Sequence, residues 1–598
     1  MRKIWGLLGS VLLVLSVATV ANAADPARPG LRDWQNQVSK VSRPASAGCF
    51  TTEYPATDWR PAACVASPKV PMTPKDGARP LVVGNGSDVA ARVPAGSFIQ
   101  TAIGSFENVN VSSGSGPIGN TGPSIANAYT LQMNTNFFAS TACAGSPNPG
   151  CRGWEQFVYA NDGSNGFVFI QYWLLNFNTT CPGGWNQFQF GGGGDIFCFR
   201  NNGGGATLVP NQPASNLGNL SLSGQASAAA DSATLFVGTT AFTRTGDNSV
   251  NAAAGWNTAE FNVFGFGGNE DGGGMFSFNP GASMTVRNRV IYGGRAAPTC
   301  VATGFTGETN NLSFGPSAPM PSQPGPALIF NQHSGGSVAN CAAAVTVGDV
   351  HAHTVAGLYY DFQGVGDYTL AEVGPDFEVQ ARHISGAPTW PNTSINQAIG
   401  ARLGKSRVAV CAGPSLVVDG EKVELKDEPL VLPTGVNVTK TGNGKYVITD
   451  EEGNSVTVTP RNGYLDVEVG VGTWPTKVRG LLGNPDNNVK LLESRDSTVF
   501  SVPLSFDDLY SKYGDSWRVK PSDSLLSVCG EKTEESNPDK PFFARDLDPK
   551  IRERAQAICR QKEIAAGWLE ACTLDVAVLG KEAAAWYVGK PPPVLDGN

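Results

Sequence analysis

The fold of the second half of the chain is decided by the stretch GLYYDFQGVGDYTLAEVGPDFEVQAR, residues 357–382. Apolar and polar side chains alternate along Asp376–Arg382 and again along Ser455–Thr459. This period of two is typical of strands that bury one face in an antiparallel sheet. The turn dipeptides Thr434-Gly435 and Gly453-Asn454 favour hairpins between such strands. The sequence therefore predicts an antiparallel β domain here.

Further blocks flank this stretch in a fixed order. They are Gly348–His351 before it and, after it, Arg479–Asn484, Leu509-Tyr510 and Asp515–Val519. In order and spacing the blocks resemble a von Willebrand factor type D domain, from about 341 to 522. The resemblance implies a second antiparallel β domain whose role is adhesion, assembly or surface association.

Single residues refine what the resemblance implies. Many relatives carry a self-cleaving Asp–Pro bond in the first block, but Val350 replaces the proline here, so we expect no self-cleavage. The resemblance also implies a possible calcium site, for which Asn484, Asp486 and Asn488 offer oxygen ligands. Ala356 stands where relatives supply a further aspartate.

The four histidines are confined to one part of the chain. The first 332 residues contain none, which excludes His-dependent triads and His-ligated zinc there. His351 and His353 are two positions apart, on one face of a strand, and could seat a metal. With only His333 and His383 as further histidines, we favour a role in the architecture of the domain.

A linker divides the chain. Charged residues are sparse before it and dense after it, and no lysine occurs between Lys75 and Lys405. Gly315–Pro326 is rich in proline, serine and glycine and cannot form a helix or a central strand. We expect four parts after the signal peptide: a β-sandwich at 24–314, a linker at 315–340, the type D-like domain at 341–522, and a helical segment with a tail at 523–598.

The part before the linker predicts a lectin-like or jelly-roll β-sandwich. Runs rich in Phe, Val, Tyr and Thr recur between Gly, Asn and Ser clusters, for example Gly166–Phe177, Ala233–Val237 and Ser283–Arg287. We find no helical period of useful length there. Its aromatic residues suggest a sugar-stacking platform for a glycan ligand, although core packing is the more ordinary explanation; they are Trp154, Tyr159, Tyr172, Trp173 and Trp185.

The N-terminus predicts secretion. Met1-Arg2-Lys3 is basic, Gly6–Val20 is apolar, and Ala21-Asn22-Ala23 fits a cleavage site, so residues 1–23 are read as a signal peptide. No later stretch approaches the ~20 apolar residues that span a bilayer. The formal net charge of −8 and a pI of about 5.3 argue against a nucleic-acid partner. We expect an extracellular protein that binds a protein or a glycan.

The twelve cysteines favour disulfides in an exported chain. Sequence proximity suggests four pairs, while connectivity remains open. These pairs are Cys49–Cys64, Cys143–Cys151, Cys181–Cys198 and Cys559–Cys572.

A carboxyl and amides stand in strand-like runs of the sandwich. Glu260 lies within Asn257–Phe264, and Ala126–Asn134 carries Gln132. Burial in such a run raises the pKa of a carboxyl, as a general acid or base requires. With Trp154-Glu155, these residues resemble the secreted glutamic peptidases, the eqolisins. The resemblance implies Glu260 as the general base and Gln132 as the oxyanion donor; the alternative is a buried acid in a binding sandwich.

The C-terminal segment predicts helices. Asp548-Pro549 forms a helix start, and Ile551, Ala555 and Ile558 follow at helical spacing. Cys559 and Cys572 resemble the Cys-containing helical segment that often follows type D domains. We expect this segment to pack on the domain before it.

Overall fold

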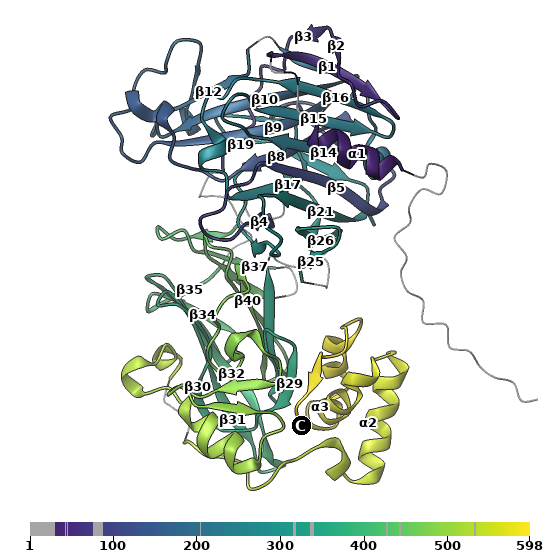
Figure 1. Cartoon of the computed structure of the whole chain (residues 1–598). Coiled ribbons are helices and arrows are strands. Elements are labelled where there is room, and N and C mark those ends of the chain that lie inside the picture. The colour runs from purple at the N-terminus through teal and green to yellow at the C-terminus, as the bar shows by residue number, and fades with distance from the viewer. Residues whose placement is uncertain are drawn as a thin grey trace, which may run out of the picture.

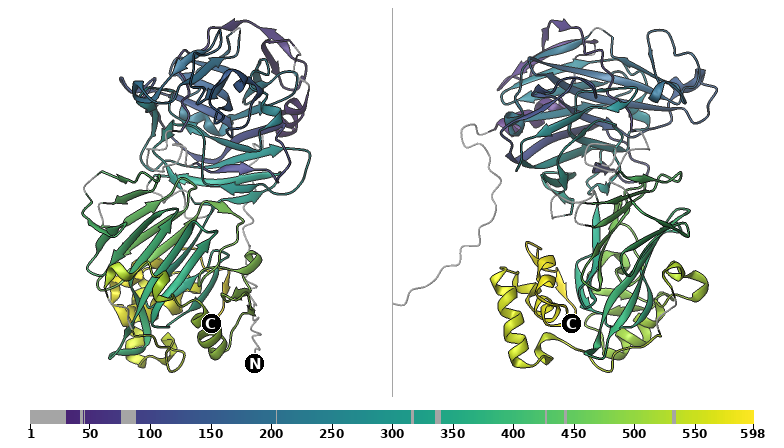
Figure 2. Two further views of the ribbon diagram at one scale, coloured as in Figure 1. Left: turned by 90° about the vertical axis from the view of Figure 1, so that its left-hand side faces the viewer. Right: turned by 180° about the vertical axis from the view of Figure 1, so that it is seen from behind.

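The computed structural model describes residues 30–41, 44, 46–75, 88–203, 205–314, 318–334, 340–425, 428–441, 444–530 and 534–598. The predicted signal peptide, residues 1–23, lies outside them. The fold is mainly β with a small helical part at the C-terminal end, as predicted (Figure 1). Figure 2 shows a β-sandwich stacked on a second β domain, with the helical segment beside the latter. In the part of the chain that is described, no helix is long and apolar enough to cross a membrane.

The sandwich consists of two large, antiparallel sheets. The first has the order β2 (Arg60–Ala62), β1 (Gly48–Glu53), β16 (Thr240–Thr245), β15 (Ser232–Val237), β14 (Leu220–Gln225), β5 (Thr101–Asn110), β21 (Ser283–Ile291), β26 (Ala327–His333) and β24 (Ser313–Phe314), with β25 (Met320–Ser322) beside β26. The second has the order β11 (Asn186–Phe188), β12 (Phe197–Asn201), β10 (Asn165–Leu175), β9 (Arg152–Asp162), β8 (Ala128–Thr135), β17 (Thr258–Phe264), β4 (Ala90–Arg92), β22 (Thr299–Val301) and β41 (Thr473–Trp474), with β13 (Ala206–Pro210) bridging β10 and β3 (Cys64–Val65).

The two sheets pack face to face through large apolar side chains. The rings of Phe106 on β5 and Phe261 on β17 lie 5.2 Å apart. Gly104 faces the Phe261 ring so closely that a Cβ there would overlap it. Glycine at this position thus lets the sheets approach. Short strands form two further small sheets, one of β18 (Gly268–Asn269) and β19 (Gly272–Gly273) and one of β23 (Thr309–Asn310), β20 (Met275–Phe278), β6 (Gly114–Gly116) and β7 (Ile125–Ala126).

The expectation of no helix in the first part was wrong. Helix α1 (Leu31–Lys40) buries Trp34 and Val38 against Phe236 and Ala241 of the first sheet. Leu31, Trp34 and Val38 are three and four residues apart, so the apolar stripe is only three side chains long. A stripe this short does not stand out among apolar strand patterns.

The expected linker at 315–340 is only partly a connection. Ala327–His333 forms β26, which pairs along its length with β21 and belongs to the first sheet. Met320–Ser322 forms the edge strand β25. Proline-rich sequence is tolerated at a sheet edge, because an edge strand leaves some N–H groups unpaired. Residues 315–317 and 335–339 lie outside the described residues.

The second β domain has two sheets around one core. The larger has the order β36 (Leu430–Val431), β37 (Asn437–Lys440), β38 (Tyr446–Thr449), β39 (Ser455–Pro460), β40 (Leu465–Val471), β27 (Ala342–Val347), β28 (His351–His353), β29 (Leu358–Asp361) and β44 (Leu595–Asp596). The other has the order β30 (Gly366–Val373), β31 (Phe377–Gly386), β32 (Trp390–Leu403), β33 (Ser406–Cys411), β34 (Ser415–Val418) and β35 (Glu421–Val423), and a hairpin of β42 (Leu491–Glu493) and β43 (Val499–Ser501) lies apart from both. The two stretches with alternating apolar and polar side chains, 376–382 and 455–459, lie in β31, which begins at Phe377, and in β39.

Two helices form the C-terminal segment. In α2 (Pro549–Gln561) the side chain of Asp548 accepts hydrogen bonds from backbone N–H groups of the first turn. A disulfide between Cys559 and Cys572 ties α2 to α3 (Leu569–Leu579). The last strand, β44, returns to pair with β29 of the second β domain. The segment thus packs on that domain.

All twelve cysteines are paired. The structure contains the four pairs suggested by proximity and two of longer range, Cys300–Cys341 and Cys411–Cys529. Cys300–Cys341 joins the sandwich to the second β domain, where β22 also pairs with β41. The two domains are therefore linked by covalent and by backbone contacts.

Candidate functional site

Strands β8 and β17 bring the two predicted catalytic residues together. In their register Gln132 is opposite Asn262, and Asn134 is opposite Glu260. Opposed residues in an antiparallel pair share a face, and so do residues two apart on a strand. All four therefore lie on the same face of the second sheet, the one that points away from the sandwich core, while Phe261 and its apolar neighbours fill the core.

An amide joins Glu260 to Gln132. Nδ2 of Asn134 donates to Oε2 of Glu260 at 2.8 Å and to Oε1 of Gln132 at 3.2 Å. Because both oxygens bond one nitrogen, they lie within about 6 Å of each other, close enough to share one small molecule. Sequence reasoning noted Asn134 as an amide in the run but gave it no role.

Glu308 is a second carboxyl that the sequence did not predict. Nε2 of Gln132 donates to its Oε2 at 3.3 Å, and the hydroxyl of Thr306 donates to the same oxygen. The backbone N–H of Thr73 donates to Oε1 at 2.6 Å. Gln132, Asn134, Glu260 and Glu308 are called the carboxyl–amide cluster below.

Neighbouring side chains fix the Gln132 amide. Its Oε1 also accepts from Nε2 of Gln156 at 2.9 Å, and Oε1 of Gln156 accepts from the Trp173 indole at 2.9 Å. Its Nε2 also donates to the hydroxyl of Thr130 at 3.0 Å. The oxygen therefore faces Asn134 and Gln156, and the N–H groups face Thr130 and Glu308.

Burial sets the protonation of the cluster. All four of its side chains are fully buried. Desolvation raises the pKa of Glu260 to about 7 and that of Glu308 to about 7. Nearby Asp88, which the sequence also did not predict, has its pKa raised well above the usual value, first by burial and then by the charge of Glu260. Near neutral pH, carboxyl and carboxylate forms are therefore both accessible.

Glu260 keeps one oxygen without a partner. Among the described residues, no group donates a hydrogen bond to its Oε1. Gly304 lies so close to this oxygen that a Cβ there would overlap it. The free oxygen is a place where a donor could bind, but it does not by itself assign a chemical role, because both carboxylate oxygens of the buried Glu155 also lack partners among the described residues.

Two segments close over the cluster. They are Val70–Lys75 and Thr303–Gly307, which together are called the cover. They meet in a backbone bridge between Pro74 and Thr306. The backbone N–H of Met72 donates to Oε1 of Gln171 at 2.7 Å, and the Met72 side chain is buried in a small apolar cluster on the same sheet face. A substrate could reach the carboxyls only after the cover moves.

The aromatic platform expected for a glycan is not on the surface. Trp154, Tyr159, Tyr172 and Trp173 are fully buried and belong to apolar clusters. Trp185 is half-buried under the guanidinium of Arg200, which lies 5.2 Å from its ring centroid. Core packing therefore accounts for four of the five residues.

The loop with the predicted calcium ligands is ordered by its own contacts. Oδ1 of Asn484 accepts from the backbone N–H of Ala356 at 3.3 Å, and its Nδ2 donates to the carbonyl of Leu491 at 2.9 Å. Asp486 is exposed, and Oδ1 of Asn488 accepts from the N–H of Lys490. Calcium binding at Asn484, Asp486 and Asn488 stays a prediction.

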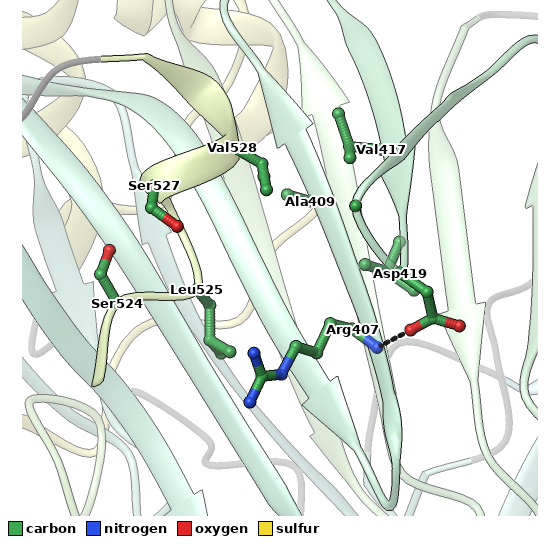
Figure 3. Close-up of a pocket in the computed structure, with 10 residues that line it drawn as sticks. Arg407, Ala409, Val417, Asp419, Ser524, Leu525, Ser527 and Val528 are labelled. Atoms are coloured by element: carbon green, nitrogen blue, oxygen red, sulfur yellow. Dashed lines mark hydrogen bonds between the residues drawn. The ribbon is translucent and has the colours of Figure 1, made fainter. Parts of the chain in front are cut away.

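A pocket of about 230 Å³ lies in the second β domain, away from the cluster (Figure 3). Its walls are β33, β34 and the segment that leads to Cys529. The backbone N–H of Arg407 donates to Asp419 at 2.7 Å, and the guanidinium reaches toward Leu525. The lining includes none of the predicted site residues.

Comparison with known proteins finds a family match in the second β domain. Residues 344–490 match the family model of the von Willebrand factor type D domain, within the range that the resemblance predicted. Zonadhesin of Sus scrofa is 31% identical over 206 residues, which cover 33% of this chain and 8% of that protein. The chain thus matches less than a tenth of the length of this relative.

One solved structure aligns with much of the chain, but only weakly. Kievitone hydratase from Nectria haematococca aligns over 68% of this chain and 98% of its own, at 10% identity and a TM-score of 0.10. A likeness this weak carries no argument about fold or activity.

Proposed function

Because residues 344–490 form a von Willebrand factor type D domain, we propose that this is a secreted protein whose type D domain mediates adhesion, assembly or surface association. The type D match carries this proposal. Six disulfides and the expected signal peptide support an oxidising, extracellular location. The partner is a protein or a glycan of the extracellular space.

Cross-linking of the full-length protein tests this proposal. A photoreactive cross-linker is needed, because no lysine occurs between Lys75 and Lys405 and an amine reagent would miss most of the sandwich. We expect the protein to bind extracellular material or itself, with cross-links concentrated in 344–490. Cross-links confined to the sandwich, or no association at all, would contradict it.

A second function is proposed for the sandwich: acid-acting hydrolysis of peptide bonds by the carboxyl–amide cluster. The observation that favours it is the connected set of two buried carboxyls and an oriented amide on one sheet face. In this proposal the Glu260 carboxylate accepts a proton from water, and the hydroxide adds to the peptide carbonyl. The Gln132 N–H that now bonds Glu308 is released when the cover opens and stabilises the oxyanion. Protonated Glu308 then donates its proton to the leaving amine as the C–N bond breaks.

The second proposal requires that the cover opens. Substrate has to replace the backbone of Met72 and Thr73, whose N–H groups now bond Gln171 and Glu308. Water that enters with the substrate solvates the carboxylates and moves their pKa values back toward the ordinary range. Because the pKa of Glu308 is higher in the closed form than in the open one, acid pH favours the closed cover, so its opening has to come from substrate binding or from a change in the cover itself.

The test compares three proteins at pH 2 to 7 against unfolded casein: wild type, Glu260→Gln and Glu155→Gln. Glu155 is the matched control, since it is a buried carboxyl on β9 of the same sheet but on the core face. The same three proteins are then compared with Met72→Asp added to each, a substitution designed to open the cover. Cleavage lost only with Glu260→Gln supports the proposal. No cleavage in any protein, or equal cleavage in all three, refutes it.

A further inference from the structure

A histidine of the type D domain stands among buried carboxylates. His351 on β28 is fully buried, and its Nε2 lies 2.6 Å from Oδ1 of Asp349 and 3.6 Å from Oδ1 of Asp575. Its Nδ1 lies 2.5 Å from Oδ1 of Asp361. Asp575 belongs to α3, so the group joins the C-terminal segment to the type D domain.

Three atoms of this group lack hydrogen-bond partners. Within the described residues, Nε2 of His351 and both carboxylate oxygens of Asp349 form no hydrogen bond, although all are buried. The short distance between Nε2 and Oδ1 is therefore not matched by hydrogen-bond geometry. Buried polar atoms without partners call for an explanation, and one bound ion would satisfy all three of these atoms. The candidate ligand atoms of Asp349, His351 and Asp575 all lie within 4.8 Å of one another.

The charge of the group also favours a bound cation. Three carboxylates, those of Asp349, Asp361 and Asp575, surround one imidazole. A fourth, Asp466, is already paired with Arg461. Even a protonated His351 leaves an excess of negative charge in the protein interior, which is costly unless a cation is bound or a proton is retained.

The surroundings hold the three ligands in place. The Asp361 carboxylate on Nδ1 of His351 orients the ring with Nε2 toward Asp349 and Asp575, the arrangement found behind metal-bound histidines. The Tyr587 hydroxyl donates to Oδ2 of Asp575 at 2.5 Å, which leaves Oδ1 directed to the centre of the group.

A glycine permits this approach. At Gly348 a Cβ would overlap both carboxylate oxygens of Asp575, and the φ of +62° at this position also favours glycine. The backbone N–H of Asp349 donates to Oδ1 of Asp575 at 2.8 Å, so the turn and the helix are fitted to each other.

We propose that Asp349, His351 and Asp575 form a binding site for a divalent transition-metal ion, with zinc as the best match, that fastens the C-terminal helical segment to the type D domain. One imidazole and two carboxylates suit zinc better than calcium or magnesium, which prefer oxygen ligands alone. Zinc–ligand distances of about 2.0–2.2 Å require Asp349 to retreat from Nε2 by less than about 1 Å. The site differs from the predicted calcium loop at Asn484, Asp486 and Asn488.

Metal content and zinc titration of the full-length protein test the site. The protein is stripped with EDTA, and binding of ZnCl₂ is followed by calorimetry and by thermal unfolding. We expect about one zinc per chain and a higher Tm with zinc. Asp575→Asn keeps the shape of the side chain and should abolish both effects, as should His351→Gln. Glu553→Gln, at an exposed position of α2, is the control and should leave both unchanged.

The variant Asp361→Asn separates a metal site from a hydrogen-bonded imidazolium. A residue that orients a metal-bound histidine lowers affinity by about 10- to 100-fold when replaced, without abolishing binding. Hydrogen exchange of α3 provides a readout that does not depend on folding of the variants, and zinc should slow it in the wild type. Failure of the wild type to bind zinc, or equal zinc binding by wild type and Asp575→Asn, would overturn the proposal and leave an imidazolium held by aspartates.

Discussion

The Gln132 amide donates to the Glu308 carboxylate across 3.3 Å, although the two residues are 176 positions apart in the chain. Gln132 comes from β8 of the second sheet, and Glu308 comes from the chain that follows the Thr303–Gly307 segment of the cover. The contact links the sheet to the cover and puts a carboxyl at the nitrogen end of the amide, while Asn134 connects its oxygen end to Glu260. The cluster thus offers two acids.

Replacing Glu308 should distinguish its proposed role as proton donor from that of Glu260 as general base. Because Glu308 is the proton donor in the proposed reaction, Glu308→Gln should lower kcat/KM by about 10²- to 10⁴-fold and remove the basic limb of the pH–rate profile. Glu260→Gln, which removes the general base, should abolish cleavage at every pH in this range. Hydrolysis rates at pH 2 to 7 measure both. A Glu308→Gln protein with the wild-type profile would leave Glu308 a structural residue of the cover.

Opening the cover should raise the rate of hydrolysis and the solvent exposure of the carboxyl–amide cluster together. Met72 is fully buried among Val158, Phe169 and Phe266. A charge at this position costs too much to bury, so Met72→Asp should expel the segment from the sheet. We expect faster hydrogen exchange at the backbone N–H of Thr73 and a higher rate of cleavage than in the wild type. The conservative variant Met72→Leu should behave as the wild type, because it keeps the apolar contact.

The buried carboxyls should make the sandwich more stable in mild acid. Glu260, Glu308 and Asp231 each have a folded pKa of about 7, raised mainly by burial above ordinary values of 4.5 and 3.8. Between about pH 4 and 7 the folded state therefore holds protons that the unfolded state has lost, so stability falls as pH rises through this window. Each group changes the free energy of unfolding by at most about 1.4 kcal/mol per pH unit.

Thermal unfolding at pH 4, 5, 6 and 7 measures this slope. Glu260→Gln and Glu308→Gln should each flatten it, because glutamine does not titrate. An unfolding temperature of the sandwich that rises steadily from pH 4 to 7 would contradict the raised pKa values.

Much of the fold could be predicted because its signals are local. The alternation along Asp376–Arg382 and Ser455–Thr459 specifies half-buried strands whatever lies around them, and the ordered blocks specify the type D domain. The strand Ala327–His333 was missed because it follows a proline-rich stretch, and its place in the sheet depends on pairing with β21, far away in the chain. Pairing over such a separation leaves little trace in local sequence.

The candidate site could be predicted in part. Gln132 and Glu260 stand in regular strands, where the period of two assigns each side chain to a face. Glu308 and Asp88 lie outside long strands, and only tertiary packing buries them. Asp575 is on a helix more than two hundred residues after His351, so no spacing in the sequence connects them. Burial and long-range contact, which define both clusters, cannot be derived from local pattern.

The disulfide of longest range should stabilise the type D domain more than a short one stabilises the sandwich. Cys411–Cys529 closes a separation of 118 residues, whereas Cys143–Cys151 closes 8. In the chain-entropy model the first disulfide raises the free energy of unfolding by about 5 kcal/mol and the second by about 2.5 kcal/mol.

The long disulfide also holds a segment that packs on the sheet. The backbone N–H of Leu525 donates to Gln380 at 2.8 Å, and the carbonyl of Leu526 accepts from Arg382. Urea unfolding of the double variants Cys411→Ser/Cys529→Ser and Cys143→Ser/Cys151→Ser, followed domain by domain with hydrogen exchange, measures the two losses. Because removal of Cys411–Cys529 also releases these contacts, its loss should exceed the other by at least about 2 kcal/mol. Equal losses would mean that packing alone, without the cross-link, keeps this segment on the type D domain.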